Sequence, residues 1–320
     1  MKKYLITGYS GFVSHHFLNY LESLQQPCNI LGVDINEAAF DLGSYKYVQG
    51  SFKNVNLLNR EEVDVLIHDY KPDYILHLAS YSSVASSWKN PVTSFVNNTN
   101  IFLNLVEQVR LLGLACRILS VGSSEEYGKV DVSTLPLHEE LPTNPVSPYA
   151  VARVSQEMLS QIYAKSYGLD IVLTRSFNHI GPGQKEMFAI SSFAKKMIGI
   201  KHSSSGEKTM TVGDIEIVRD FVDVRDVVKA YYLLLQKGEK GEIYNICSGK
   251  GITLKEVLQT MKNILQIEVN IQIDKELIRP ADNPVIIGSN KKIKDKIGWQ
   301  PSISLETSLK DLLNYWDNNQ

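Results

Sequence analysis

Short apolar segments alternate with longer segments over the first 176 residues of the chain. The short segments are rich in aliphatic and β-branched side chains, and helices are expected to fill most of the intervals between them. Strands that alternate with helices in this way pair in parallel and are covered by helices on both faces. The pattern therefore predicts an α/β fold built on a doubly wound parallel sheet. The predicted strands are residues 3–7, 29–33, 46–49, 74–78, 117–120 and 170–175.

The pattern changes after about residue 177, where glycine turns and shorter elements replace the regular alternation. A helix is again predicted over 224–235, followed by a strand over 242–247. The tail, 302–316, is expected to form a final edge strand and a helix. We find no internal repeat, low-complexity tract or long linker, so we expect the two parts of the chain to interleave.

We therefore predict two interleaved domains. The larger one carries the parallel sheet and comprises residues 1–177 and about 214–246. The smaller α/β region comprises residues 178–213 and 247–320. Because ligands bind at the carboxyl ends of the strands in such sheets, the smaller region is expected to cover that mouth and to bind a ligand there.

Two predicted helices, over 91–112 and 148–167, are long and carry apolar residues on more than one face. The simpler interpretation is that both are buried against the sheet. The alternative is that they form a helix pair shared across a homodimer interface. The sequence pattern leaves both interpretations open.

The composition is that of a globular protein with no electrostatic signature of a polyanion-binding surface. The chain has 320 residues, of which 43% are hydrophobic and 21% charged, enough for a sizeable core. Its net charge is −2 and its basic residues are dispersed. This argues against nucleic acid or an anionic membrane as a partner, so an anionic ligand must be held by local contacts.

The cysteines indicate neither a disulfide framework nor a metal site. Cys28, Cys116 and Cys247 are odd in number, far apart, and each lies in or beside a predicted buried strand, so we expect core thiols. No signal-peptide-like segment opens the chain, and no apolar run approaches the ~20 residues of a membrane span. We therefore expect a cytoplasmic protein without a metal.

The chain opens with the pattern of a dinucleotide site. The first predicted strand ends at Gly8, Gly11 follows, and an apolar-periodic helix begins directly after them. Gly8 allows a tight turn, Gly11 lets a pyrophosphate approach the backbone, and the helix N-terminus attracts that anion. Ser14 occupies the third glycine position, which normally serves helix packing. The turn predicts a Rossmann-type sheet, with candidate cofactor contacts at Gly8, Ser10, Gly11, Phe12 and Val13.

Asp34 ends the second predicted strand, about 20 residues after Ser14, where dinucleotide sites hold the ribose. A carboxylate at this place binds ribose hydroxyls and repels a 2′-phosphate. We therefore favour NAD(H) as the cofactor, with NADP(H) as the alternative. The plainer interpretation of the same residues is an ordinary strand-to-helix turn followed by a solvated acid.

A tyrosine and an arginine one helical turn apart are the candidate catalytic pair. Tyr149 and Arg153 are separated by four residues, so their side chains share one helix face. A cation beside a phenol stabilises the phenolate that forms when tyrosine donates its proton, so Tyr149 is a candidate general acid. The fifth predicted strand leads to Ser123 and Glu125, which can add a hydroxyl and a second proton-transfer group. An ordinary helix-terminal aromatic beside a surface charge is the alternative.

Further motifs extend this pattern from end to end of the chain. They are Thr7-Gly-x-x-Gly11-Phe, His77-Leu-Ala79, Gly122-Ser-Ser-Glu-Glu-Tyr127-Gly, Ser147-Pro-Tyr149, Asn178-x-x-Gly-Pro-Gly-Gln184, Arg219-Asp-Phe-Val-Asp223 and Arg279-Pro280. With them the chain resembles the extended short-chain dehydrogenase/reductase family of nucleotide-sugar enzymes, also described as NAD-dependent epimerases/dehydratases. Within it the chain looks most like GDP-4-keto-6-deoxy-D-mannose reductases and their relatives, the GDP-mannose 4,6-dehydratases.

By this resemblance Tyr149 would be the proton donor, Ser123 its hydroxyl partner and Asn97 a supporting residue on a helix. The family pattern is Tyr-x-x-x-Lys, and this chain has Arg153 in the lysine position. We expect slower turnover, because arginine is bulkier than lysine and does not release a proton. The resemblance implies a GDP-sugar substrate, a substrate-binding smaller region and a homodimer. It adds Leu78 and Ala79 as cofactor contacts and Ser83, Asn178, Gln184, Lys195, Arg219, Arg279 and Asp282 as substrate contacts.

Four functions remain open from the sequence. The leading one is NAD(P)H-dependent reduction of the C4 keto group of a GDP-4-keto-6-deoxy sugar, which needs one acid, Tyr149, helped by Ser123. A 4,6-dehydratase also needs Glu125. The resemblance argues against this function, because the short segment after Asp34 lacks the arginine-rich loop that it implies for dehydratases of this family. C4 epimerisation is a third possibility. A non-catalytic dinucleotide sensor is the contrasting one, motivated by Arg153 and Ser14.

Overall fold

Seven parallel strands form the central sheet of the computed structural model, which describes residues 1–38, 42–203, 208–278 and 283–319. Their order is β10-β6-β5-β4-β1-β2-β3, so the chain runs outward from β1 on one side and then crosses to β4 on the other. This doubly wound topology was predicted, and it opens a crevice where the strand order reverses. The strands are β1 (Lys2–Thr7), β2 (Cys28–Asp34), β3 (Val48–Asn54), β4 (Tyr74–His77), β5 (Arg117–Ser123), β6 (Asp170–Ser176) and β10 (Ile243–Ile246).

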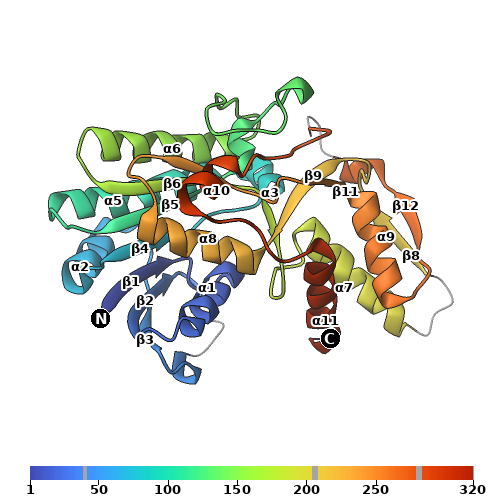
Figure 1. Ribbon diagram of the computed structural model, residues 1–320, viewed down its shortest axis with the longest axis horizontal. Helices are drawn as coiled ribbons and strands as arrows, with labels where there is room; N and C mark the ends of the chain where they lie inside the picture. Colours follow the sequence, from blue (N-terminus) through green and yellow to red (C-terminus); the bar gives the residue numbers. More distant parts are fainter. Residues whose placement is uncertain (39–41, 204–207, 279–282, 320) are drawn as a thin grey trace.

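Helices cover both faces of this sheet (Figure 1). Phe17 and Leu18 of α1 and Leu234 of α8 belong to the apolar cluster on one face, and Phe102 of α5 belongs to the cluster on the other. None of the helices in the described segments is both long and apolar enough to cross a bilayer. The covering helices are α1 (Phe12–Ser23), α8 (Val224–Lys237) and α10 (Lys291–Ile297) on the first face, and α2 (Arg60–Tyr70), α5 (Ile101–Leu111) and α6 (Pro148–Lys165) on the second.

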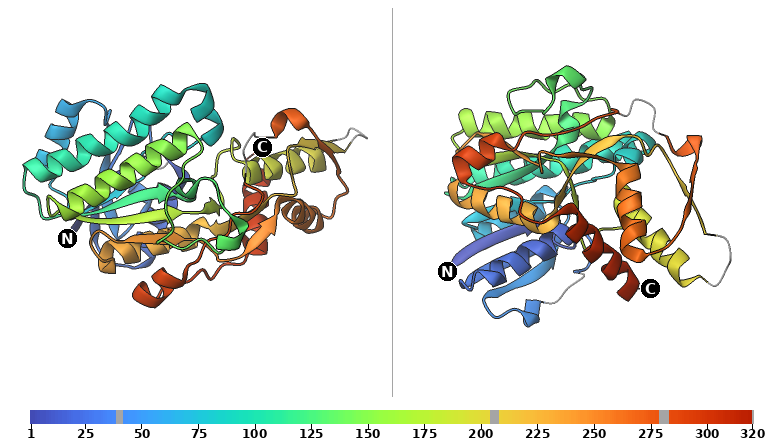
Figure 2. Two further views of the ribbon diagram at one scale, coloured as in Figure 1. Left: turned by 90° about the horizontal axis from the view of Figure 1, so that it is seen from above. Right: turned by 45° about the vertical axis from the view of Figure 1, so that its right-hand side comes forward.

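A smaller α/β region lies beside the carboxyl ends of the central strands (Figures 1 and 2). It has a three-stranded sheet in the order β11-β9-β7 and a separate parallel pair, β8 with β12. Its helices enclose an apolar cluster of their own, which includes Phe193, Met261 and Leu312. The elements are β7 (Asn178–Ile180), α7 (Ala189–His202), β8 (Thr209–Val212), β9 (Val218–Asp223), β11 (Gly251–Thr253), α9 (Leu254–Leu265), β12 (Asn270–Ile273) and α11 (Leu305–Asn318).

Three local expectations differ from the structure. The third strand runs over Val48–Asn54 and not over 46–49, because this edge strand exposes most of its side chains and carries no apolar run. The helix expected over 91–112 is α4 (Pro91–Phe95), a π-helical turn (Val96–Asn100) and then α5. The tail forms α11 without the expected edge strand. The exact division into two domains stays a prediction.

The end of the chain is tied to the central sheet through Asp226, in the first turn of α8. Its buried carboxylate accepts hydrogen bonds at 2.8 Å from the Ser302 N–H, the Ser302 hydroxyl and the Ile303 N–H. The indole of Trp299, itself fully buried, donates to the Asp226 carbonyl at 2.9 Å. These contacts hold the segment that leads into α11 against α8.

Substitution of Asp226 by alanine is expected to lower the free energy of unfolding by about 1–3 kcal/mol, because three part-buried hydrogen bonds to the tail are lost. Urea unfolding followed by circular dichroism measures the change. Glu306→Ala, at an exposed position in the first turn of α11, is the control and should change it by less than about 0.5 kcal/mol. Equal stability of Asp226→Ala and wild type would contradict the proposed role of Asp226 in holding the tail against α8.

Candidate active site

A cleft of about 1280 Å³ opens at the carboxyl ends of the central strands. One wall comes from the turns that follow β1, β2, β4 and β5, and the other comes from the smaller region. Residues far apart in the sequence therefore line one cavity. Those predicted from the sequence and found in its lining are Gly8, Ser10, Gly11, Phe12, Val13, Asp34, Leu78, Ala79, Ser83, Asn97, Ser123, Glu125, Tyr149, Arg153, Asn178, Gln184 and Arg219.

The turn after β1 has the geometry of an anion cradle. Gly8 has a φ of 69°, and a Cβ at this position would lie 2.7 Å from the Ala79 nitrogen, so only glycine is accommodated without a shift. Gly11 is the N-cap of α1, and because glycine has no side chain it makes no capping hydrogen bond to the first turn of that helix. The helix N-terminus therefore keeps backbone donors for a negatively charged ligand.

Asp34 lies at the end of β2, next to this turn. Its Oδ2 accepts the Ser10 N–H at 3.1 Å, and its Oδ1 accepts the backbone and side-chain N–H groups of Asn36 at 2.9 and 3.1 Å. These bonds hold the carboxylate in the lining of the cleft. A glycine cradle, an uncapped helix N-terminus and a fixed carboxylate together fit a dinucleotide with an unmodified ribose.

Tyr149 and Arg153 meet on the buried face of α6. The helix is capped by Ser147, whose Oγ accepts the Ala150 N–H at 3.1 Å. The Arg153 Nε donates to the Tyr149 hydroxyl at 3.1 Å, so the two side chains are in direct contact as their spacing predicted. The cation is thus placed at the oxygen that would carry negative charge after proton donation.

Gln156 continues this face and fixes the arginine. The Arg153 Nη1 donates to the Gln156 Oε1 at 2.6 Å. The Gln156 Nε2 in turn donates to the Ser120 hydroxyl at 2.9 Å and to the Val121 carbonyl at 3.3 Å. The guanidinium is therefore anchored to strand β5. Sequence reasoning missed Gln156, although its position three residues after Arg153 on the same helix face could have indicated it.

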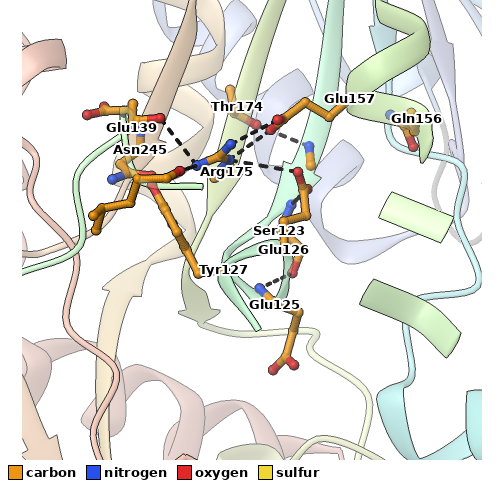
Figure 3. Close-up of polar contacts among 12 residues, drawn as sticks. Ser123, Glu125, Glu126, Tyr127, Glu139, Gln156, Glu157, Thr174, Arg175 and Asn245 are labelled. Carbon is orange, nitrogen blue, oxygen red and sulfur yellow. Dashed lines mark hydrogen bonds and ion pairs between the residues drawn. The ribbon is translucent and has the colours of Figure 1, made fainter. Parts of the chain in front are cut away.

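Ser123 ends β5 and faces the same cleft. Its Oγ accepts the Glu125 backbone N–H at 3.2 Å, and this bond opens the short helix Ser124–Tyr127. The Glu125 side chain also lines the cleft, pointing away from the buried acids behind it (Figure 3). A hydroxyl and a carboxylate therefore line the same cavity as the Tyr149 phenol.

The residues expected to contact a substrate fall into three groups. Ser83, Asn178, Gln184 and Arg219 line the cleft. The Gln184 Oε1 is buried and has no hydrogen-bond partner within the described residues, which leaves it for a ligand. Lys195 does not line the cleft, because its ammonium pairs with Glu186 and lies 5.0 Å from the Trp316 ring centre. Arg279 and Asp282 lie outside the described residues.

Asn97 lies within the π-helical turn before α5 and also lines the cleft. Its Nδ2 donates to the Thr93 carbonyl at 3.0 Å. Such turns often occur at functional sites, because they redirect one or two side chains of a helix. The sequence analysis did not anticipate the apolar part of the lining, whose exposed or half-buried members include Met187, Phe188, Phe221, Leu277 and Ile278.

Fold and cleft together define a Rossmann-type enzyme of the short-chain dehydrogenase/reductase class. A family model described as GDP-mannose 4,6 dehydratase matches residues 5–312. The chain belongs to this family, within the extended epimerase/dehydratase branch, as the motifs predicted. The expected class of NAD(P)-dependent enzymes of nucleotide-sugar metabolism is thereby confirmed.

Similar proteins cover nearly the whole chain. The GDP-6-deoxy-D-mannose reductase of Pseudomonas aeruginosa is 33% identical over 317 residues, covering 99% of this chain and 98% of that protein. A structure of RMD from Pseudomonas aeruginosa complexed with NADPH has a TM-score of 0.87 at 32% identity and covers 100% of both chains. A UDP-glucose 4-epimerase from Thermus thermophilus in complex with NAD has a TM-score of 0.84 at 27% identity, covering 98% of both. Both cofactors therefore occur among these relatives.

Replacement of Asp34 by alanine is expected to remove a preference for NADH over NADPH, because the carboxylate repels a 2′-phosphate and holds ribose hydroxyls. We expect wild type to bind NADH about tenfold more tightly than NADPH, equivalent to about 1.4 kcal/mol, and the variant to bind both within about threefold. Fluorescence titration measures both affinities. Glu37→Ala removes a nearby cleft-lining carboxylate and should keep the preference; equal affinities in wild type would contradict this role of Asp34.

Proposed function

We propose that this chain reduces the C4 keto group of a GDP-4-keto-6-deoxy sugar, with NADH as the favoured reductant. The observation that carries the proposal is the Tyr149 hydroxyl, 3.1 Å from the Arg153 Nε, in a cleft that also contains the dinucleotide turn and Ser123. The near full-length similarity to a GDP-6-deoxy-D-mannose reductase supports the choice of sugar. A reduction of this kind needs a single proton donor beside the carbonyl oxygen.

Tyr149 donates that proton to the C4 oxygen. NADH, held by the turn at Gly8 and by Asp34, would supply the hydride for C4 when bound. Ser123 donates a second hydrogen bond to the same oxygen and so stabilises the negative charge that develops on it. Arg153 stabilises the tyrosinate left after the transfer. Because a guanidinium keeps its proton in proteins, Arg153 acts through charge and does not relay a proton, which is why we expect slow turnover.

The nucleotide diphosphate binds on the side of the smaller region. Arg219 supplies a local cation in a protein whose net charge is −2. Its Nη1 donates to the Val218 and Asn283 carbonyls at 2.9 and 2.8 Å, which fixes the side chain at the cleft. Asn178, Gln184 and Ser83 add polar contacts from the same lining. A fixed guanidinium suits phosphate oxygens, because its N–H groups can bind two of them at once.

A 4,6-dehydratase is the second candidate, and the position of Glu125 favours it. This carboxylate lines the cleft two residues after Ser123. A dehydratase oxidises C4, removes water across C5 and C6 and returns the hydride, so it needs an acid or base in addition to Tyr149. Glu125 supplies such a group in the second function, whereas it only lines the cavity in the first.

One assay separates the candidates. Purified protein is incubated with GDP-4-keto-6-deoxymannose and NADH, and separately with GDP-mannose and NAD, while absorbance of the reduced cofactor and the sugar products are followed. Oxidation of NADH by the keto sugar is the expected result. Loss of water from GDP-mannose without net cofactor change would establish the dehydratase instead. Cofactor binding without either reaction would indicate a sensor.

Tyr149→Phe is expected to lower kcat for the keto sugar by about 10²–10⁴-fold, because the proton donor is lost while the ring remains. Binding of NADH, measured by fluorescence, should stay within about twofold of wild type. Tyr167→Phe removes an equivalent hydroxyl from a tyrosine that is 54% exposed and outside the cleft, and it should leave kcat unchanged. Full activity of Tyr149→Phe would rule out the proposed acid.

We also propose a homodimer formed through the helix pair that the sequence analysis singled out. Exposed apolar side chains occur on α3 (Val84–Lys89), α4 and α6, three helices that pack against one another, and a contiguous exposed apolar patch commonly marks an interface. On α6, Val151, Met158 and Ile162 recur at positions that share one helix face. The exposed set is Trp88, Val92, Phe95, Val151, Met158 and Ile162.

Met158→Glu is expected to convert the dimer into a monomer, because a carboxylate would be buried without a partner at the centre of that face. Sedimentation velocity at micromolar protein concentration measures the state. Ile273→Glu, at a 49% exposed position on β12 in the smaller region, is the matched control and should stay dimeric. A monomeric wild-type protein would contradict the proposed interface.

The cysteines support a cytoplasmic location, which we propose for this chain. Cys28, Cys116 and Cys247 are all free and buried. Burial raises the pKa of the Cys28 thiol to about 11 and that of Cys116 to about 12, so both stay protonated at neutral pH. Thiols of this kind are typical of proteins in reducing compartments.

A further inference from the structure

Glu126 is a buried acid directly behind Ser123. Its side chain is 0% exposed, and its Oε1 accepts the Ser123 backbone N–H at 2.6 Å. Space for this contact comes from Gly122, where any Cβ would collide with Glu126 Oε1 and with the Thr174 carbonyl. Ser123 and Glu126 thus form a capping box whose acid lies in the interior, although glutamate is almost never fully buried unless it is paired.

Two buried carboxyl groups share one guanidinium at this place (Figure 3). Glu157 of α6 accepts two hydrogen bonds of 2.8 Å from the Arg175 Nε and Nη2 of β6. The second oxygen of Glu126, Oε2, is 3.9 Å from the Arg175 Nε. Within the described residues this oxygen accepts no hydrogen bond, and the partner to which it can donate one is Glu157. Glu157 is therefore the acid that Arg175 hydrogen-bonds, whereas Glu126 contacts it only at the longer distance.

The protonation of the pair follows from its surroundings. Burial, and then the charge of Glu157 and a hydrogen bond with it, raise the pKa of Glu126 well above its ordinary range. Burial also acts to raise the pKa of Glu157, but hydrogen bonds from Arg175 and from Glu126 outweigh it and lower that pKa. These opposite directions favour the neutral form of Glu126 and the charged form of Glu157.

The remaining contacts hold Arg175 from its other sides. Its guanidinium carbon lies 4.6 Å from the centre of the Tyr127 ring, and its Nη1 donates to the Glu139 and Leu141 carbonyls at 3.4 and 3.3 Å. The Tyr127 hydroxyl donates to the Asn245 Oδ1 at 2.8 Å. The arginine is thus a fixed support from β6, and the two acids connect it to α6 and to the turn that carries Ser123.

We propose that Glu126 is a positioning residue for the Ser123 hydroxyl and that it acts as a neutral carboxylic acid. The inference rests on the proposed reduction, in which Ser123 hydrogen-bonds the reacting carbonyl oxygen. Glu126 fixes the Ser123 backbone, and the Glu125 N–H occupies an acceptor site of the Ser123 Oγ at 3.2 Å. With the Ser123 backbone and this acceptor site of its Oγ both fixed, the Ser123 hydroxyl can donate its proton into the cleft that Ser123 lines.

The neutral form is essential to this arrangement. A second negative charge beside Glu157 would be repelled in the interior, since one arginine cannot compensate two carboxylates there. Glutamine has the shape of the neutral acid: its oxygen can accept the Ser123 N–H, and its amide can donate to Glu157. Leucine fills a similar volume and leaves the Glu157–Arg175 pair intact, but it offers Ser123 no acceptor.

The test compares Glu126→Gln with Glu126→Leu in the NADH oxidation assay with the keto sugar. We expect kcat of Glu126→Gln within about threefold of wild type. We expect kcat of Glu126→Leu to fall about tenfold or more, with KM for the sugar changed less than about threefold, because the lost contact acts through the reacting group. Glu139→Gln alters another buried acid of the network that does not touch Ser123, and it should leave kcat unchanged.

A second readout needs no turnover. Hydrogen exchange of the backbone amides of residues 123–127 in the free protein should match wild type in Glu126→Gln and be faster in Glu126→Leu. If wild type does not reduce the keto sugar, the proposed function fails. The exchange comparison still tests whether Glu126 fixes the Ser123 backbone. Loss of kcat or of protection in Glu126→Gln, or wild-type values in Glu126→Leu, would overturn the inference.

Discussion

Parallel pairing of β1 with β4 and of β4 with β5 is the constraint on which the rest of the site depends. Because these strands run in one direction, the turns that follow them open at one edge of the sheet. Those turns carry Gly8, Ala79 and Ser123, and α6 brings Tyr149 to the same edge. The smaller region then covers this edge. The resulting cavity is lined by residues from many segments, and no single segment of the chain forms it alone.

The interior behind this edge is polar, which is costly unless each group has a partner. Gln156 connects Arg153 to β5, and the Glu157–Arg175 pair connects α6 to β6. These contacts replace apolar packing between the helix and the sheet at the carboxyl ends of the strands. Their benefit is a fixed geometry, because donors that are already oriented need no reorganisation when charge develops on a bound ligand.

Arginine at position 153 departs from the Tyr-x-x-x-Lys pattern that the sequence resemblance led us to expect. Its Nε contacts the Tyr149 hydroxyl while its Nη1 is held by Gln156, so one planar group bridges the Tyr149 phenol and the Gln156 amide. A lysine ammonium has a single nitrogen and would be a point charge at this place. The substitution therefore keeps the cation but ties it more firmly to the protein interior.

The sequence by itself determined the features that depend on neighbouring residues: the strand, glycine turn and helix around Gly8, and the shared face of Tyr149 and Arg153. Backbone geometry encodes these at short range. Only the tertiary structure decided that Lys195 pairs with Glu186 outside the cleft and that Glu126 lies beside Glu157 and Arg175. Lys195 and Glu186 meet where α7 begins in the smaller region, whereas Glu126, Glu157 and Arg175 come from three separate elements that only the packing of α6 on the sheet brings together.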